Sequence, residues 1–487
     1  MTQRAHETLR IAVTFPAPGQ PRGPVAMGMS ITPDTVQSLQ PEHDVVGRCL
    51  DQLQRLGFTV TAQGRLSASI RGPRETFEKV FGTSLTELDL SARQPVAGHL
   101  AQEAVFFPPD GAGWRVPKSL QGLIDDAYIQ WPHIYFQRWT PPIPSLLPPP
   151  VTSHHLRVPH DVSVLLDADE VHRKGITGRG VRVAMIDTGF HHELPYFESR
   201  GYRSSVALAS GATDPRLDGN GHGTGESANL FAVAPDITFI GIKLENEAGG
   251  LGASVLEGFQ EALRHSPQII TVSLGYDLIS NPQTRAHRTT LPNGLRALEA
   301  EVAQAVADGI VVVFSAGNGH VAFPGMMPDV ISAGGVHVKA DGRMEASDYA
   351  SAFVSKIYPG RKVPDLCGLV GMSPGAEYIM LPLQPGCAID TDKAATDGTA
   401  PNDGWALFSG TSAAAPQLAG VCALLLQCDP HLTPSDVKAI LRRSSRDVTR
   451  GAASAASNEL TAIAAAPGTD GATGSGLACA AAAIRQL

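Results

Sequence analysis

The spacing of hydrophobic residues changes at about residue 160. Before that point, short stretches alternate between a two-residue period and a helical period. The pattern predicts strands over residues 9–15, 58–62 and 66–70, the last two forming a hairpin, and helices over residues 41–56 and 73–81. The order strand, helix, two strands, helix predicts a small α+β domain with an antiparallel, ferredoxin-like sheet.

Longer apolar runs alternate with helical segments in the rest of the chain. They predict strands over residues 181–186, 237–244, 269–274 and 310–314, and helices over residues 251–265 and 295–308. Such alternation predicts an α/β fold with a doubly wound, mainly parallel sheet. Ligands of this architecture bind where strands end, so Asp187 and Asn318, which follow two of these strands, become candidates for a site.

A proline-rich segment separates the two patterns. Residues 141–150 carry six prolines and read as a stiff tether, followed by a polar stretch through His155. We therefore divide the chain into an α+β domain over residues 1–140, a linker over residues 141–160 and an α/β domain over residues 161–487. An exposed linker is a place for proteolysis, and we expect a cut between Pro150 and His160.

The composition indicates which partners, location and cysteine chemistry to expect. The 487 residues are 43% hydrophobic and 17% charged, with a formal net charge of −9, so no nucleic-acid partner is expected. The sequence has no apolar run of membrane-spanning length and no apolar leader, so we expect no membrane partner and a cytoplasmic location. The six cysteines lack metal-ligand spacing. We expect reduced thiols, buried at Cys422 and Cys428, and leave a disulfide such as Cys367–Cys387 open.

The stretch Phe408–Pro416 crowds small residues around Ser412 and leads into a buried helix over residues 418–426. A hydroxyl at a helix N-terminus is suited to attack a carbonyl, because the free backbone N–H groups there can donate hydrogen bonds to the oxyanion that forms. Taken alone, a serine there is more often a helix cap. Taken alone, His222 in its glycine-rich stretch and Asn318 in its turn are likewise more often structural residues.

Together, these residues form a catalytic set. Serine catalysis needs a nucleophile, a base, an acid that orients the base, and a donor for the oxyanion. Ser412, His222, Asp187 and Asn318 supply one of each. The chain order Asp, His, Ser is the order known from subtilisin.

Residues from about 164 to 485 resemble the subtilisin-like serine peptidases, on the stretches Ile186–Gly189, Gly221–Gly225, Ser315–Asn318 and Gly410–Pro416. The resemblance implies a serine endopeptidase acting through an acyl-enzyme, with Asp187 as orienting acid, His222 as base, Ser412 as nucleophile and Asn318 as oxyanion donor. It also implies a peptide or protein substrate paired beside Ser273, Leu274 and Gly275, with the P1 pocket next to Ala316 and Gly317. No cofactor is required; bound calcium is common in the family, but no loop here has assignable ligands.

Residues from about 8 to 135 resemble the activation prodomain of sedolisin-type peptidases, on stretches such as Phe77–Leu85 and Val116–Ile124. The resemblance implies a zymogen whose own prodomain acts as an intramolecular inhibitor or chaperone. One departure from the subtilisin pattern is Glu226, one helical turn beyond His222, which we expect to face solvent.

Two alternatives stay open. The chain would be a protease-shaped binding or regulatory protein if the first domain clamped it permanently. It would be a sedolisin-type serine-carboxyl peptidase if it worked in acid with a glutamate and an aspartate as acid–base pair. Because His222 and Asn318 occupy the corresponding positions, we expect activity at neutral to alkaline pH, lost as His222 protonates below its ordinary pKa of about 6.5.

Overall fold

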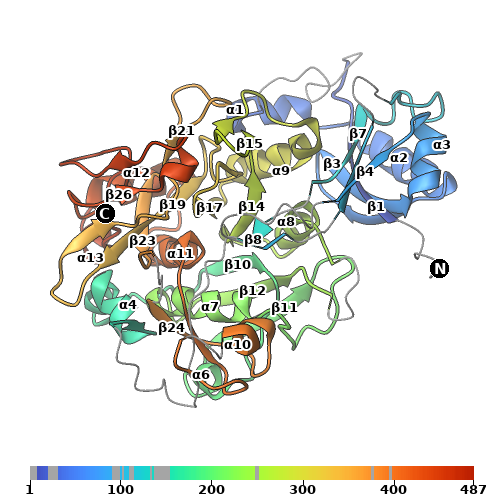
Figure 1. Cartoon of the computed structure of the whole chain (residues 1–487). Coiled ribbons are helices and arrows are strands. Elements are labelled where there is room, and N and C mark those ends of the chain that lie inside the picture. Colours follow the sequence, from blue (N-terminus) through green and yellow to red (C-terminus); the bar gives the residue numbers. More distant parts are fainter. Residues whose placement is uncertain are drawn as a thin grey trace.

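The computed structural model describes residues 8–19, 31–89, 99–100, 104–108, 114–131, 134–135, 154–246, 252–373, 378–393 and 397–487. A small α+β unit lies beside a larger α/β unit (Figure 1). The proline-rich tether expected over residues 141–150, and the start of the expected cut region, lie outside the described residues.

The small unit is a four-stranded antiparallel sheet in the order β2-β3-β1-β7. Its strands and helices are β1 (Thr8–Thr14), α2 (His43–Arg55), β2 (Thr59–Gln63), β3 (Ser67–Pro73), α3 (Arg74–Phe81) and β7 (Asp126–Ile129). The first five match the predicted elements to within a few residues. Strand β7, which the sequence did not indicate, pairs with β1 and completes the ferredoxin-like strand order.

The two faces of β3 contact different parts of the protein. Ala68 and Ile70 are buried in a core shared with α2 and α3, because successive strand residues point to opposite faces. Ser67, Ser69 and Arg71 point the other way, toward two helices of the large unit. The small unit therefore has its own apolar core, and β3 meets the large unit through polar side chains, while Ala12, Leu66 and Tyr128 join an apolar cluster with residues of the large unit.

The large unit is built on an eight-stranded sheet in the order β11-β12-β10-β13-β17-β19-β20, with β23 also paired to β19. Its strands are β10 (Arg182–Asp187), β11 (Arg203–Leu208), β12 (Thr238–Lys243), β13 (Ile269–Val272), β17 (Val311–Ser315), β19 (Ile331–Val338), β20 (Met344–Ala346) and β23 (Leu366–Leu369). All neighbouring pairs are parallel except β19 with β20. The predicted doubly wound, mainly parallel sheet is confirmed.

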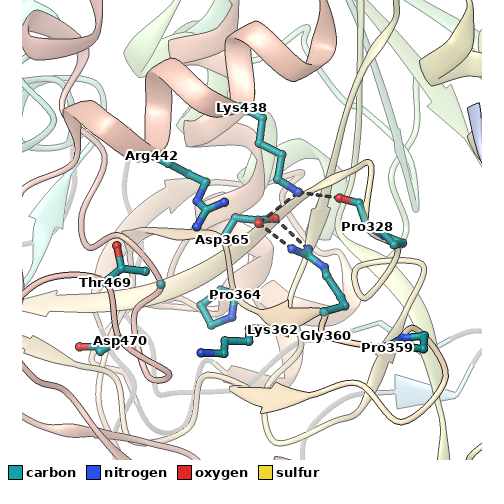
Figure 2. A pocket seen from close by; sticks show the side chains of 12 residues that line it. Pro328, Pro359, Gly360, Lys362, Pro364, Asp365, Lys438, Arg442, Thr469 and Asp470 are labelled. Carbon is teal, nitrogen blue, oxygen red and sulfur yellow. Dashed lines mark hydrogen bonds and ion pairs between the residues drawn. The ribbon is translucent and has the colours of Figure 1, made fainter.

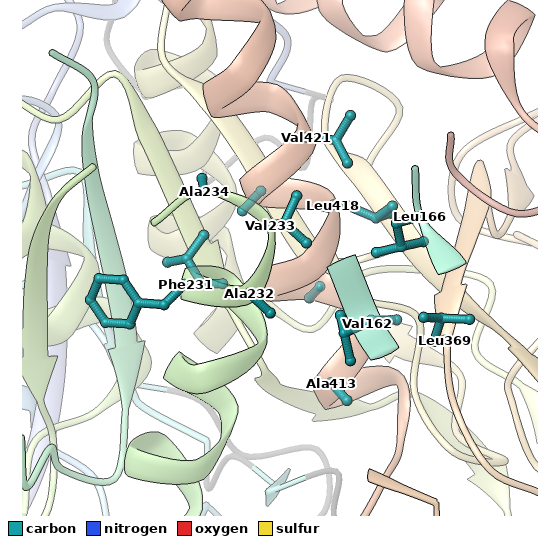
Figure 3. Close-up of a cluster of buried hydrophobic side chains, with 14 of the residues drawn as sticks. Val162, Leu166, Phe231, Ala232, Val233, Ala234, Leu369, Ala413, Leu418 and Val421 are labelled. Carbon is teal, nitrogen blue, oxygen red and sulfur yellow. The ribbon is translucent and has the colours of Figure 1, made fainter. Parts of the chain in front are cut away.

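Helices cover both faces of this sheet. On β10, Val183 and Met185 join one apolar cluster with α7 (His222–Val233) and α11 (Thr411–Cys428). Ala184 and Ile186, pointing to the opposite face, join a second cluster with α8 (Val255–Arg264) and α9 (Arg296–Ala307). Figure 3 shows part of the first cluster, in which the C-terminal end of α7 at Val233 lies beside Leu418 and Val421 of α11, and Leu369 of β23 belongs to the same cluster.

Helix α11 is the central helix of the first cluster. It is long and apolar enough to cross a membrane, with a mean hydropathy of 1.3, but 89% of it is buried within the protein, as expected of a core helix. All six cysteines are free thiols, so the open Cys367–Cys387 disulfide is not formed. Cys422 is buried as expected, whereas the expectation was wrong for Cys428, which is exposed where α11 ends.

The C-terminal part of the expected linker belongs to the large unit. Leu156–Arg157 forms β9, which pairs with β24 (Ile379–Pro382), and helix α4 (His160–Leu165) packs against α7. Leu156 is buried because its side chain joins the first apolar cluster. Residues 156–160 are therefore folded structure and not a tether.

Candidate active site

The ends of three neighbouring strands assemble the site. Strands β10, β13 and β17 pair in parallel register, so their carboxyl ends meet at one edge of the sheet. Asp187 is the last residue of β10, Ser273 follows β13, and the turn that leads to Asn318 follows β17. Residues far apart in the sequence thus share one location because of the winding of the sheet.

His222 and Asp187 form the first pair of the site. Helix α7 begins at His222, whose Nδ1 lies 2.6 Å from Asp187 Oδ1, and both side chains are fully buried. The next residue, Gly223, explains how the helix comes so close. A Cβ at that position would lie 2.2 Å from the carbonyl oxygen of Gly189 and 2.9 Å from Asp187 Cβ, so any larger residue would push His222 away from the carboxylate.

Asp218 holds the start of α7 in place. Its Oδ2 accepts hydrogen bonds from the backbone N–H and the hydroxyl of Thr224, at 2.9 and 2.6 Å, and its Oδ1 accepts from Gly221 N–H and the Thr188 hydroxyl, both at 2.9 Å. An acid is favoured at a helix N-terminus because it satisfies orphan N–H groups. No role for Asp218 was expected from the sequence, because it lies three residues before the N-cap residue Gly221 and not at the N-cap itself.

Ser412 is the second residue of α11, and α11 runs parallel to α7. Three contacts progress together along α7 and along the segment that leads into α11. A Cβ on Gly225 would meet Phe408, which lies just before α11. Farther along, Asn229 accepts a hydrogen bond from Gln417, and a Cβ on Gly420 would meet Val233. Because the contacts advance in the same direction, the N-termini that carry His222 and Ser412 lie at the same end of the helix pair. Ser412 is 1% exposed.

Asn318 is fixed by the residue just before Ser412. Its Oδ1 accepts hydrogen bonds from the Thr411 backbone N–H at 2.9 Å and from the Thr411 hydroxyl at 3.1 Å. The same hydroxyl accepts from Gly317 N–H at 3.0 Å. With its carbonyl side committed to Thr411, the amide of Asn318 presents its NH₂ group on the opposite side. Thr411 is a positioning residue that the sequence analysis missed.

His320, which follows Asn318 by two residues, is also part of this turn. Its Nδ1 lies 3.2 Å from the backbone nitrogen of Asn318, and its own backbone N–H donates to Ser351 at 2.9 Å. The ring therefore accepts at Nδ1 and carries its proton at Nε2. His320 supports the backbone of the turn on which Asn318 sits.

The residues expected to bind substrate lie around Ser412. The Ser273 hydroxyl donates to the Ser412 carbonyl oxygen at 2.9 Å. Gly317 adopts a φ of 99°, and a Cβ there would lie 3.1 Å from the Cβ of Ala322. Ala316 is fully buried beside it. The structure brings together the two segments that flank the expected P1 pocket.

Leu274 and Gly275 begin β14 (Leu274–Asp277), which leaves the main sheet and pairs with β18 (Ala322–Phe323). This is why the strand expected over residues 269–274 ends early. The other edge of β14 is occupied by the chain itself, because β8 (Ile134–Tyr135) pairs antiparallel to it with Tyr135 opposite Leu274 and Ile134 opposite Gly275. The chain direction of β8 runs toward Ser273 and so toward Ser412.

Glu226 does not face solvent, so that expectation was wrong. It is 1% exposed, and its Oε1 lies 3.9 Å from His222 Nε2. Burial disfavours the charged imidazolium, but the carboxylate of Asp187, with Glu226 and Asp218 adding to it, outweighs burial and raises the pKa of His222 to about 9. Burial raises the pKa of Glu226 to about 8. The side chain points inward because α7 is buried on every side.

A cavity of about 390 Å³ elsewhere in the large unit is lined by several cations, including Arg361, Lys438 and Arg442 (Figure 2). Arg361 is bound to Asp365 through two contacts of 2.6 and 2.8 Å, and Lys438 lies 3.1 Å from the same carboxylate. Lys438 also donates to the carbonyl oxygens of Pro328 and Val330. None of the catalytic candidates lines this cavity, so the sheet edge remains the candidate active site.

Comparison with known proteins finds relatives that match most of the large unit. A model of the Subtilase family matches residues 178–475. Serine protease AprX of Bacillus subtilis (strain 168) is 32% identical over 326 residues, which are 58% of this chain and 67% of that protein. Subtilisin E of the same organism is 28% identical over 298 residues, 58% of this chain and 64% of that protein. The chain thus spans about two thirds of the length of these relatives.

A solved structure resembles the chain in fold. Fervidolysin from Fervidobacterium pennivorans, a keratinolytic enzyme related to subtilisin, superposes with a TM-score of 0.56 at 17% identity, covering 100% of this chain and 62% of that chain. The similarity supports the assignment of the α/β fold.

Proposed function

The chain belongs to the subtilase family of serine-type endopeptidases, and from this premise we propose that it hydrolyses peptide bonds through an acyl-enzyme formed on Ser412. The observation that carries the proposal is the Asp187–His222 contact of 2.6 Å at the same end of the helix pair as Ser412. A buried carboxylate bound to one imidazole nitrogen fixes the ring so that the other nitrogen can exchange a proton with a hydroxyl.

In the proposed reaction, His222 Nε2 takes the Ser412 hydroxyl proton as Oγ bonds to the scissile carbonyl carbon. The negative charge that develops on the carbonyl oxygen is stabilised by the Asn318 NH₂ group and by the Ser412 backbone N–H at the start of α11. His222 then gives the proton to the leaving amine as the C–N bond breaks. Water and the same base complete hydrolysis of the ester.

The chain is proposed to be a zymogen, with the small unit as its intramolecular inhibitor. Strand β8 occupies the edge of β14 along which an extended substrate would pair, and it does so in the antiparallel direction that leads toward Ser412. The likeness of the small unit to a sedolisin-type prodomain remains a prediction. Because β9 and α4 are folded into the large unit, we propose that activation cuts the chain between Tyr135 and Leu156.

A fluorophosphonate probe, which reacts only with an activated serine, tests the proposal. We expect the chain cut between the two units to be labelled, and the Ser412→Ala chain to remain unlabelled. N-terminal sequencing of the matured protein should locate the cut. Equal failure of both proteins after the cut would favour a permanently clamped binding protein, and an optimum in strong acid would favour the sedolisin-type mechanism.

A further inference from the structure

Glu226 is a buried carboxylate on α7, the helix that begins at His222. Its Oε1 lies 3.9 Å from His222 Nε2, and its Oε2 accepts a hydrogen bond of 2.9 Å from Asn229. Glu226 is the only acid in α7, most of whose residues are small or apolar. A buried carboxylate is costly unless its neighbours compensate it, so the position of Glu226 calls for a compensating environment.

A chain of hydrogen bonds supplies part of that environment. The Asn229 carbonyl accepts from the Gln417 side chain at 3.1 Å, and the Gln417 carbonyl accepts from the Leu369 backbone N–H at 2.7 Å. Gln417 also donates to the Leu369 carbonyl at 3.2 Å. Asn229 and Gln417 are fully buried. The network links Glu226 to β23 through α11, the helix that carries Ser412, and so fixes the carboxylate relative to both catalytic side chains.

The charged groups around this carboxylate come from three elements. His222 lies one turn earlier on α7, Asp187 ends β10 on the far side of the imidazole, and Asp218 stands before α7. From α11 and β25 (Trp405–Phe408), the side chains facing this part of α7 are the uncharged Gln417 and Phe408. The imidazole therefore has a carboxylate at each of its two nitrogens.

We propose that Glu226 is a positioning residue for the reaction, which stabilises the imidazolium form of His222 from the Nε2 side and thereby sets the pH range of the enzyme. The inference rests on the proposed function of His222. Glu226 takes up no proton during the cycle: the proton of Ser412 moves to Nε2 and then to the leaving amine. The carboxylate acts through charge at 3.9 Å, and the raised pKa of His222 agrees with this role.

The test compares the rate of Ser412 labelling by a fluorophosphonate, across the acid to alkaline range, in the cut chain and its Glu226→Gln variant. Gln keeps the size and the carbonyl that accepts from Asn229, but removes the charge. We expect the acid limb of the profile to move to lower pH by about one to two units. We also expect the labelling rate on the alkaline plateau to fall, on the order of tenfold, because a less basic imidazole removes the Ser412 hydroxyl proton more slowly. On the acid side the variant should then be labelled as fast as the parent or faster.

Glu299→Gln is the matched control. Glu299 is fully buried on α9, away from His222, and binds Arg296 and Tyr358, so its loss removes a buried carboxylate without touching the site. Its profile should keep the parent acid limb. Glu226→Asp, which draws the charge back, should shift the limb by less than Glu226→Gln and serves if the latter does not fold.

A Glu226 variant whose profile runs parallel to the parent would overturn the inference, since a purely structural role lowers the rate equally at every pH. That outcome leaves the proposed function intact. If the cut parent chain is not labelled at all, the proposed function fails first and the inference fails with it. The two failures are distinguished by the parent protein alone.

Discussion

A single added methyl group at Gly64 should loosen the small unit from the large one. Gly64 lies in the turn between β2 and β3, facing Glu301 of α9, and a Cβ there would lie 2.0 Å from Glu301 Oε1. Glu301 is fully buried, and its Oε1 accepts a hydrogen bond of 2.7 Å from the Ser67 hydroxyl. In the Gly64→Ala chain the carboxylate would have to move and give up that hydrogen bond, or the turn would have to lift.

The magnitude follows from these contacts. Overpacking costs about 1–3 kcal/mol, and a hydrogen bond to a charged acceptor contributes about 1.5–3 kcal/mol when it is fully lost. With partial relaxation we expect a net cost of about 2 kcal/mol, which is a factor of about 30 in the docking equilibrium. If β8 blocks access to Ser412 as proposed, a fluorophosphonate reaches Ser412 only when β8 leaves β14, and labelling of the intact, uncut chain should accelerate by about that factor.

Gly47→Ala is the control. Gly47 lies within α2 of the same small unit, and a Cβ there meets no atom within 4 Å. This substitution should leave the labelling rate unchanged while slightly favouring the helix. If the Gly64→Ala chain folds with an unchanged melting temperature of the large unit and is labelled no faster than the parent, then the turn contact does not hold the inhibitor in place and the reasoning is refuted.

Further outcomes follow from other contacts. Asn318→Ala should lower kcat on the order of 10²–10³-fold, a magnitude taken from the corresponding amide of subtilisin itself. Thr411→Val should lower kcat roughly tenfold, because it only disorients that amide. Steady-state kinetics on a peptide substrate would check both values. Gly420→Ala would place a Cβ 2.6 Å from that of Val233, so calorimetry should show a loss of about 1–3 kcal/mol of stability. Burial raises the pKa of Glu301 in the docked state, so docking is favoured at low pH and weakens as pH rises. The ratio of labelling rates of the intact parent and Glu301→Gln chains, in which the titration of His222 cancels, should therefore rise with pH.

Much of the fold could be predicted from the sequence, because most of its helices and strands each have one regular spacing of hydrophobic residues. The strands over residues 181–186 and 237–244, and the two helices that cover one face of the sheet, appear within a few residues of their expected places because each buries one continuous apolar surface. Strand β7 was missed because four residues carry too little pattern to distinguish a strand from a turn. Strand β14 was fused to β13 because its change of partner leaves no trace in hydrophobicity.

Part of the candidate site could be predicted from the sequence for a different reason. Asp187, His222, Asn318 and Ser412 stand at the ends of strands and helices, where local sequence is informative. The roles of Thr411 and Asp218 depend on hydrogen bonds to residues that only the fold brings near. Glu226 was misread because a charged residue is normally solvated, and only the packing of α11 against α7 shows that this one is enclosed.

The alternation along β3 has a consequence for what happens after the chain is cut. Because Ala68 and Ile70 already fill a core within the small unit, the part of β3 that separation would uncover is polar, namely Ser67, Ser69 and Arg71, while the neighbouring Ala12, Leu66 and Tyr128 would expose apolar surface. The polar part of this surface can exchange its hydrogen bonds for bonds to water, whereas the apolar part favours rebinding. A detached fragment, which keeps its own core, would thus stay folded and could rebind a neighbouring copy of the enzyme until it is digested, so the onset of activity would depend on total protein concentration.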